Sequence, residues 1–173
     1  TEERHKVACQ ALWNKLVESG DIYLSKYAGW YAVRDEAYYG EDELKDGPGG
    51  KKIAPSGAEC EWVEEESYFF KLSAWADRLM KLYEENPNFI QPESRRNEVM
   101  SFVKSGLRDL SVSRTRLTWG VPVPNAPGHV MYVWIDALTN YISALGYPDE
   151  NADLFKKFWP ASIHMVGKDI LRF

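Results

Sequence analysis

The pattern of apolar positions is clearest between His129 and Tyr141. Residues 130–135 form a continuous apolar run, which is typical of a short strand buried in a mostly parallel sheet. The period then becomes helical, and Asp136 is a suitable N-cap. The apolar residues that follow at helical spacing are Ala137, Leu138, Tyr141, Ile142 and Leu145. A strand that passes directly into a helix predicts a ligand site at the carboxyl edge of a sheet.

The chain before this stretch alternates between helical and extended patterns. Residues 2–19 are amphipathic and predict a helix that Gly20 ends. Aromatic residues interrupted by glycines predict short antiparallel strands in residues 22–44. Residues 46–59 have the composition of a loop, and residues 60–65 predict another strand.

Two further helices and several connections complete the pattern. Residues 73–86 predict a helix with Ser73 as its cap, and residues 92–106 predict a second helix. The remaining elements are a strand at 110–113, a proline-rich loop at 119–128, a strand at 160–166 and the start of a last helix at 167–170.

The order of these elements predicts an α/β fold. Strand and helix alternate in the second half, which is typical of a parallel sheet with right-handed crossovers. We expect residues 1–20 and 108–173 to belong to this α/β part. Residues 21–107 form a small α+β unit that we interpret as an insertion.

Composition excludes several classes of protein. The chain has 173 residues, of which 45% are hydrophobic and 27% are charged, and its net charge of −5 argues against a general nucleic-acid coat. Cys9 and Cys60 form no CxxC pair, so two thiols in a reducing compartment are the simpler interpretation. No signal peptide and no apolar run of about 20 residues is visible, and we expect a cytoplasmic protein that does not enter a membrane. Phe173 ends the sequence one turn into a new helix, so we expect a fragment of something longer.

Trp134, Ala137 and Tyr141 are the first candidates for a binding site. Their spacing would let the two aromatic rings flank one apolar pocket with Ala137 as its floor. Such walls suit a thioether, because sulfur packs favourably against aromatic rings. The alternative is that all three are core residues, which is the commoner role of aromatics at helical spacing.

Charged residues near predicted strand ends are the second candidates. Gly167, Lys168 and Asp169 could allow close backbone approach, bind phosphate and accept a hydrogen bond from a ribose or an ammonium group. Arg114 could clamp a phosphate or carboxylate. The alternatives are a plain strand-to-helix turn capped by Asp169 and a surface salt bridge of Arg114.

The histidines suggest no metal site. The three in the chain have no partners at the spacing of metal ligands: His5, His129 and His164.

Four blocks in order resemble the methionyl-tRNA synthetase family, a group of class I aminoacyl-tRNA synthetases. The blocks are YFFKL at 68–72, SR leading to WGVPVP at 113–124, WIDALTNY at 134–141 and GKDILRF at 167–173. WGVPVP alone is less specific, because the synthetases for leucine, isoleucine and valine carry similar stretches. The resemblance covers residues 20–173.

The resemblance implies a fold and a reaction. The catalytic domain of this family is Rossmann-like and is split by a connective-peptide insertion, here residues 21–107. The reaction activates methionine with ATP and Mg²⁺ to methionyl-adenylate and then transfers it to tRNA(Met). The resemblance places the methionine pocket on Trp134, Ala137, Tyr141, Ile170 and Phe173. It places activation on Arg114, Lys168 and Asp169, and nucleotide binding on Gly167 and Asp169.

Departures from the family shape further expectations. Many members bind zinc through cysteine pairs in the insertion, but here Cys60 stands alone, so we expect no zinc there. HIGH-like and KMSKS-like motifs do not occur in the sequence, so we expect that this piece alone does not activate methionine. We expect a monomer. The alternatives are a synthetase for another aliphatic amino acid and a non-catalytic binding module that reuses the fold.

Overall fold

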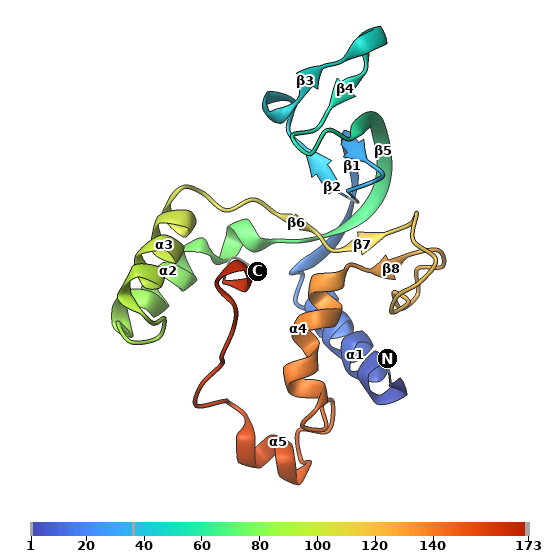
Figure 1. Cartoon of the computed structure of the whole chain (residues 1–173). Helices are drawn as coiled ribbons and strands as arrows, with labels where there is room; N and C mark the ends of the chain where they lie inside the picture. The colour runs from blue at the N-terminus through green and yellow to red at the C-terminus, as the bar shows by residue number, and fades with distance from the viewer. Residues whose placement is uncertain (1, 36, 172–173) are drawn as a thin grey trace. The chain divides into compact units, whose positions relative to one another are not determined.

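The computed structural model describes residues 2–35 and 37–171 and divides the chain into two compact units (Figure 1). One unit is built from Thr1–Tyr23 and Tyr68–Phe173, and the other from Leu24–Ser67. The predicted insertion, residues 21–107, contains the whole second unit. Its boundaries stay a prediction.

Helix α1 (Glu3–Glu18) confirms the first predicted helix. Glu3 in the first turn and Lys15 in the last turn both complement the helix dipole. Gly20 has a φ of +77°, and its N–H donates to the carbonyl of Val17 while the N–H of Asp21 donates to Leu16. This pair of bonds is a Schellman ending, which favours glycine at the left-handed position.

Helices α2 (Ala76–Glu85) and α3 (Glu93–Lys104) confirm the next two. Helix α2 begins later than predicted, because η3 (Leu72–Trp75) forms a 3₁₀ turn before it. Ser73 is therefore not its cap, and the Ser73 hydroxyl donates to Asp109 instead at 2.5 Å. Tyr83, Val99 and Val103 form the buried contact between the two helices.

In residues 129–141, the boundary between strand and helix differs from the prediction. Strand β8 is only Val130–Met131, and helix α4 (Val133–Ser143) already includes Trp134 and Ile135. Asp136 lies in the first turn and is not the N-cap, which is Tyr132. A short apolar run has the same appearance in a buried strand and a buried helix turn, so periodicity could not locate the boundary.

Strand β8 pairs antiparallel with β7 (Ser113–Arg114), and not in parallel as predicted. The proline-rich loop joins this pair, because the N–H of Met131 donates to Val121 and the N–H of Val123 donates to His129. The backbone of β8 thus has partners on both sides.

The chain after α4 corrects another prediction. Helix α5 (Asp153–Phe158) follows, and residues 160–166, all described, form no strand. Six of these seven residues are exposed, so no buried face specifies a strand pairing. The chain then makes the single 3₁₀ turn η4 (Lys168–Ile170).

The Leu24–Ser67 unit is built on two long neighbouring strands. Strands β1 (Ile22–Ala32) and β5 (Glu59–Phe70) are neighbours in a sheet of order β2-β1-β5-β4-β3, and β6 (Leu110–Ser111) pairs with the far end of β5. Residues 68–70 of the YFFKL block thus belong to a strand. The predicted loop at 46–59 contains β4 (Lys52–Ile53), which pairs with β3 (Lys45–Asp46); β2 is Ala37–Tyr39. A small core of Ala32, Ala54, Ala58 and Cys60 closes the unit.

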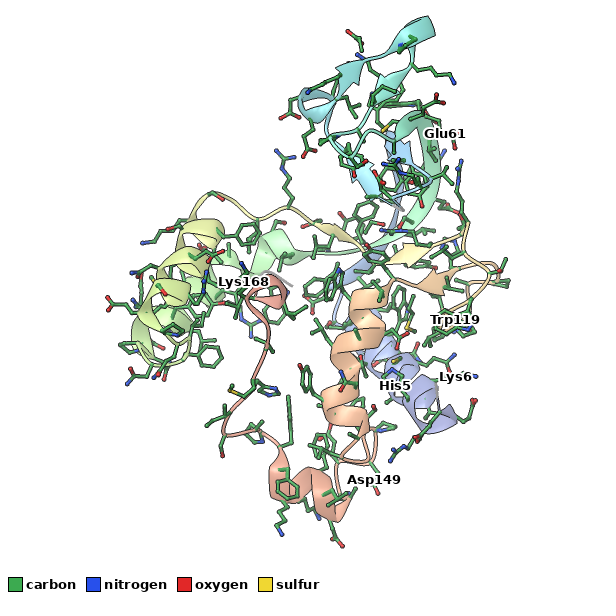
Figure 2. All side chains as sticks on the ribbon, viewed as in Figure 1. His5, Lys6, Glu61, Trp119, Asp149 and Lys168 are labelled. Carbon is green, nitrogen blue, oxygen red and sulfur yellow. The ribbon has the colours of Figure 1, made fainter. Side chains whose placement is uncertain are left out.

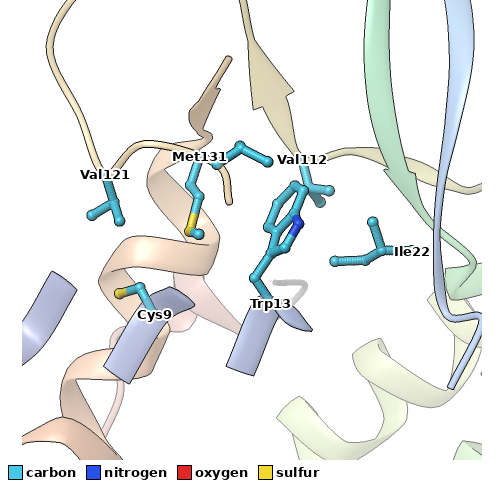
Figure 3. Packing of buried hydrophobic residues seen from close by; sticks show 7 residues of the cluster. Cys9, Trp13, Ile22, Val112, Val121 and Met131 are labelled. Atoms are coloured by element: carbon cyan, nitrogen blue, oxygen red, sulfur yellow. The ribbon is translucent and has the colours of Figure 1, made fainter. Parts of the chain in front are cut away.

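The main core lies where α1 meets the β7–β8 region. Trp13 is 1% exposed and packs with Cys9, Ile22, Val112 and Met131 (Figure 3). The Trp13 ring also meets Tyr68 edge-on at a centroid distance of 5.4 Å. This packing fixes α1 against the strands that precede α4, and therefore positions the start of α4.

In the described part of the chain, no helix combines the length and the apolar character that a membrane span requires.

Candidate functional site

An apolar cavity of about 470 Å³ lies in the first unit. Helices α1, α2, α3 and α4 and the segment after α5 contribute to its walls. Aromatic residues that line it include Tyr132, Trp134, Tyr141, Trp159 and His164. A site of this size with apolar walls is typical for a small organic ligand.

Helix α4 brings two of the predicted residues together. Trp134 and Tyr141 are seven residues apart, which is close to two turns, so they share a face of the helix. Both line the cavity, and Leu138 lies between them in its wall. Ala137 is half-buried on α4, but it is not among the described lining residues.

Two aromatic residues that sequence reasoning missed complete this wall. The ring of His164 meets Tyr141 edge-on at a centroid distance of 5.0 Å and meets Trp159 at 5.8 Å. Both residues reach the cavity because the chain turns back after α5, and no local signal marks that return. Polar His164 ring nitrogens at an otherwise apolar wall could give a ligand a hydrogen-bonding partner.

Arg114 adjoins the cavity through an aromatic ring. Its guanidinium lies 3.8 Å from the centroid of the Tyr132 ring, and Tyr132 lines the cavity. Nη1 of Arg114 donates to the hydroxyl of Ser111 and to the carbonyl of Ser113, each at 2.7 Å. These contacts hold the side chain against the backbone, the Ser111 hydroxyl and the Tyr132 ring. Among the described residues, no carboxylate pairs with its charge.

The predicted residues near the C-terminus lie on the 3₁₀ turn η4. Gly167 precedes this turn in an extended backbone conformation, with a φ of −64°. A Cβ atom added at Gly167 would meet no atom within 4 Å. The fold of the chain therefore does not itself require glycine at this position. Ile170 is half-buried, and its neighbour Leu171 lines the cavity. The side chain of Asp169 and all of Phe173 lie outside the described residues.

Lys168 faces a second depression of about 870 Å³ in the same unit. Arg95 and Arg108 also line this depression, and Arg95 is paired with Glu98 at 2.6 Å. Lys168 itself is exposed (Figure 2). The structure thus places Lys168 on a basic surface and Trp134 on an apolar one.

The sequence predicted that His5 has no partners at metal-ligand spacing, but the fold brings His5 together with Cys9 and Asp136 in one polar cluster. His5 Nε2, Cys9 Sγ and Asp136 Oδ1 lie within 4.8 Å of one another. The spacing of His5 and Cys9, four residues apart on a helix, was the visible signal. Nε2 and Oδ1 are 2.6 Å apart, whereas two ligands of a tetrahedral zinc ion at bond lengths of about 2.1 Å would be roughly 3.4 Å apart. The cluster therefore fits hydrogen bonding better than metal binding.

The pKa of the Cys9 thiol is raised to about 11, chiefly by burial and also by the nearby Asp136 carboxylate, and a hydrogen bond with Thr139 acts in the opposite direction. Cys9 is 0% exposed. A thiol in this state is a poor nucleophile and a poor metal ligand, because both roles need the thiolate. Cys9 is therefore a packing residue.

Comparison with known proteins gives the family. The model of the family described as "tRNA synthetases class I (M)" matches residues 1–173. The chain is 63% identical to a methionine–tRNA ligase of Rickettsia bellii and 61% identical to one of Brucella suis, in each case over 100% of this chain and 33% of the relative. The chain thus spans about a third of the length of these curated relatives.

A solved structure is also similar. The methionyl-tRNA synthetase of Mycobacterium tuberculosis, in a crystal structure bound by methionyl-adenylate, matches with a TM-score of 0.87 and 51% identity. The match covers 99% of this chain and 34% of that one. The predicted mixed α/β class, as part of a Rossmann-like class I enzyme, is confirmed by this likeness. Family model, relatives and structure agree, and the chain belongs to the class I tRNA synthetases of the methionine group.

Proposed function

We propose that this chain is part of a methionine–tRNA ligase, which activates methionine with ATP to methionyl-adenylate and transfers it to tRNA(Met). The family model and the names of the relatives support this proposal. They favour it over a synthetase for another aliphatic amino acid and over a non-catalytic module. The chain spans about a third of its relatives, so the activity is proposed for the longer ligase.

The observation that carries the proposal is the apolar cavity beside α4. Trp134 and Tyr141 stand in one wall of it, two helical turns apart. Methionine offers an unbranched thioether that packs favourably against aromatic rings at a sulfur-to-ring distance of about 5 Å. We assign Trp134, Ala137, Tyr141, Ile170 and Phe173 to the methionine pocket.

The charged residues are assigned to the nucleotide. Arg114 and Lys168 supply positive charge for the phosphates and the reacting carboxylate, and Asp169 an acceptor for the ribose or the ammonium group. Gly167 lets the nucleotide approach the backbone, which is consistent with the open space where its Cβ would lie. Mg²⁺ binds together with the ATP phosphates, because it prefers phosphate oxygens and water as ligands.

Several finer assignments belong to the same proposal. Residues 21–107 act as a connective-peptide insertion that binds no zinc. The ligase is a monomer of the cytoplasm. This chain alone is inactive, because the HIGH-like and KMSKS-like motifs are absent from its sequence.

Thermal unfolding of the complete ligase tests the amino-acid specificity. A non-hydrolysable methionyl-adenylate analogue at about 100 times its Kd should stabilise the fold by roughly 2.7 kcal/mol. The isoleucyl analogue at the same concentration is the matched control and should shift the unfolding temperature far less. Equal shifts with both analogues, or a larger shift with the isoleucyl one, would reject methionine as the substrate.

A further inference from the structure

Helices α1 and α4 are joined by a polar contact made by one imidazole ring. His5 lies in the first turn of α1, on the side of that helix near α4 (Figure 2). Its Nε2 is 2.6 Å from Oδ1 of Asp136, and its Nδ1 is 2.8 Å from the hydroxyl oxygen of Ser143. A single side chain of α1 thus holds α4 at its first turn and at its last residue.

Both ring nitrogens of His5 are in hydrogen-bonding contact with α4. The Ser143 hydroxyl lies 2.8 Å from Nδ1 and also 3.3 Å from the carbonyl of Asn140. Nε2 faces a carboxylate oxygen, which can only accept when ionised. Nε2–H of His5 therefore donates to the Asp136 carboxylate, and Nδ1 shares a second hydrogen bond with the Ser143 hydroxyl.

This pair is more sheltered than the surface pairs of the chain. The side chains of His5 and Asp136 are 14% and 23% exposed, whereas those of Lys15 and Glu150 are 65% and 57% exposed. Removing one partner of a sheltered pair leaves the other charge without compensation, which costs far more than breaking a solvated pair. The His5–Asp136 contact is therefore a strong restraint on α4.

The restrained face of α4 lies opposite the cavity. Asp136 follows Trp134 by two residues, and Ser143 follows Tyr141 by two residues, a rotation of about 200° in each case. Trp134 and Tyr141 line the cavity, while Asp136 and Ser143 contact His5. A rotation or slide of α4 that broke the His5 contacts would move both cavity residues together.

We propose that His5 is a positioning residue for amino-acid binding. By holding Asp136 and Ser143, it fixes the rotation and the register of α4, and so fixes where Trp134 and Tyr141 stand in the cavity wall. This inference rests on the proposed function, because it takes the amino acid in that cavity to be methionine. His5 itself does not line the cavity and acts only through α4.

The test compares four variants of the complete ligase. His5→Gln keeps a polar side chain but cannot bridge both partners, Asp136→Asn removes the charge, and the double variant removes both. Lys15→Gln is the matched control, because it breaks the exposed α1 ion pair with Glu150 at 3.0 Å and touches neither the cavity nor the His5 cluster. Methionine KM and ATP KM come from pyrophosphate exchange, and the mobility of α4 comes from amide hydrogen exchange.

His5→Gln and Asp136→Asn should each raise the methionine KM about tenfold and leave the ATP KM within about twofold, while amides of α4 exchange faster. The double variant should be no worse than the more severe single one, since both remove the same interaction. Lys15→Gln should change none of these quantities. Ser143→Ala, which removes only the Nδ1 contact, should show a smaller effect in the same direction and serves if His5→Gln does not fold.

Three outcomes would overturn the proposal in different ways. Unchanged α4 exchange and unchanged methionine KM in His5→Gln would mean that the contact restrains nothing. Faster α4 exchange with an unchanged methionine KM would mean that His5 holds the helix but that methionine does not use this wall, which also counts against the proposed function. A parallel rise of both KM values would assign His5 to general stability.

Discussion

Cys9 illustrates how burial sets the chemistry of one residue. Its side chain lies in the core with Trp13 and Met131 (Figure 3), and burial raises the pKa of its thiol from the ordinary 9.0 to about 11. In the unfolded chain this thiol would lose its proton about two pH units earlier than in the folded one. Between those two values the unfolded state therefore binds fewer protons.

The stability of the protein should consequently fall as pH rises from about 9 to about 11. The loss assigned to Cys9 is at most about 2.8 kcal/mol, because the pKa differs by about two units and each unit corresponds to about 1.4 kcal/mol. Urea unfolding of the parent and of Cys9→Ala at several pH values measures it. The difference between the two free energies of unfolding should change over this range; parallel curves would contradict the assignment.

At the scale of single residues, the sequence predicted which residues of α4 share the cavity wall. It did not predict the contacts between residues that are far apart in the chain. Trp134 and Tyr141 share a wall because helical spacing is local information. Trp159 and His164 reach the same wall only through the return of the chain after α5. His5 and Asp136 are 131 residues apart, and a contact at that separation has no signature in one sequence.

Among the elements, the strands of the Leu24–Ser67 unit enclose a core that is mainly alanine. Its buried residues are Ala32, Ala54, Ala58 and Cys60, which bury little apolar area. Hydrogen bonds to Asp35 supplement this core. The Asp35 carboxylate accepts from the hydroxyls of Ser56 and Tyr39, and Arg34 lies 3.3 Å from it. The hydrogen bond from Ser56, followed by those from Tyr39 and Arg34, lowers the pKa of Asp35 despite opposing desolvation.

Asp35→Asn should loosen this unit selectively, because an amide cannot accept all of these hydrogen bonds as a carboxylate does. We expect faster hydrogen exchange at the Ala54 amide, which donates to the Ala58 carbonyl at 2.8 Å, with no change in α1. Asp42→Asn, an exposed substitution, is the control. The same loosening should appear in the parent as pH falls through the lowered pKa of Asp35, since its contribution is complete only above the ordinary value of 3.8. Equal exchange in both variants would contradict this role.

Element boundaries were predictable where caps mark them and not where an apolar run is short. Gly20 ends α1 as predicted, because a Schellman ending has a residue preference. The run at 130–135 is divided between β8 and α4, and residues 160–166 form no strand although their composition suggested one. Both errors concern runs of six or seven residues that tertiary contacts decide.

On the scale of the whole molecule, the central claim is that α4 contributes the wall of a methionine pocket. The mixed α/β class and the family were recognisable from four sequence blocks, and the comparisons support both. The antiparallel pairing of β7 with β8 could not be predicted, because a single sequence does not specify which strands pair. The arrangement of α1, α4 and the segment after α5 around one cavity is the new information that the structure supplies.

Steady-state pyrophosphate exchange by Tyr141→Ala in the complete ligase tests this claim most directly. Tyr141 lines the cavity two turns from Trp134, so truncation should raise the methionine KM at least about tenfold, equivalent to roughly 1.4 kcal/mol, with the ATP KM nearly unchanged. Tyr141→Phe keeps the ring and should remain close to the parent. An equal loss of methionine and ATP binding, or a methionine KM that Tyr141→Ala leaves unchanged, would contradict the account.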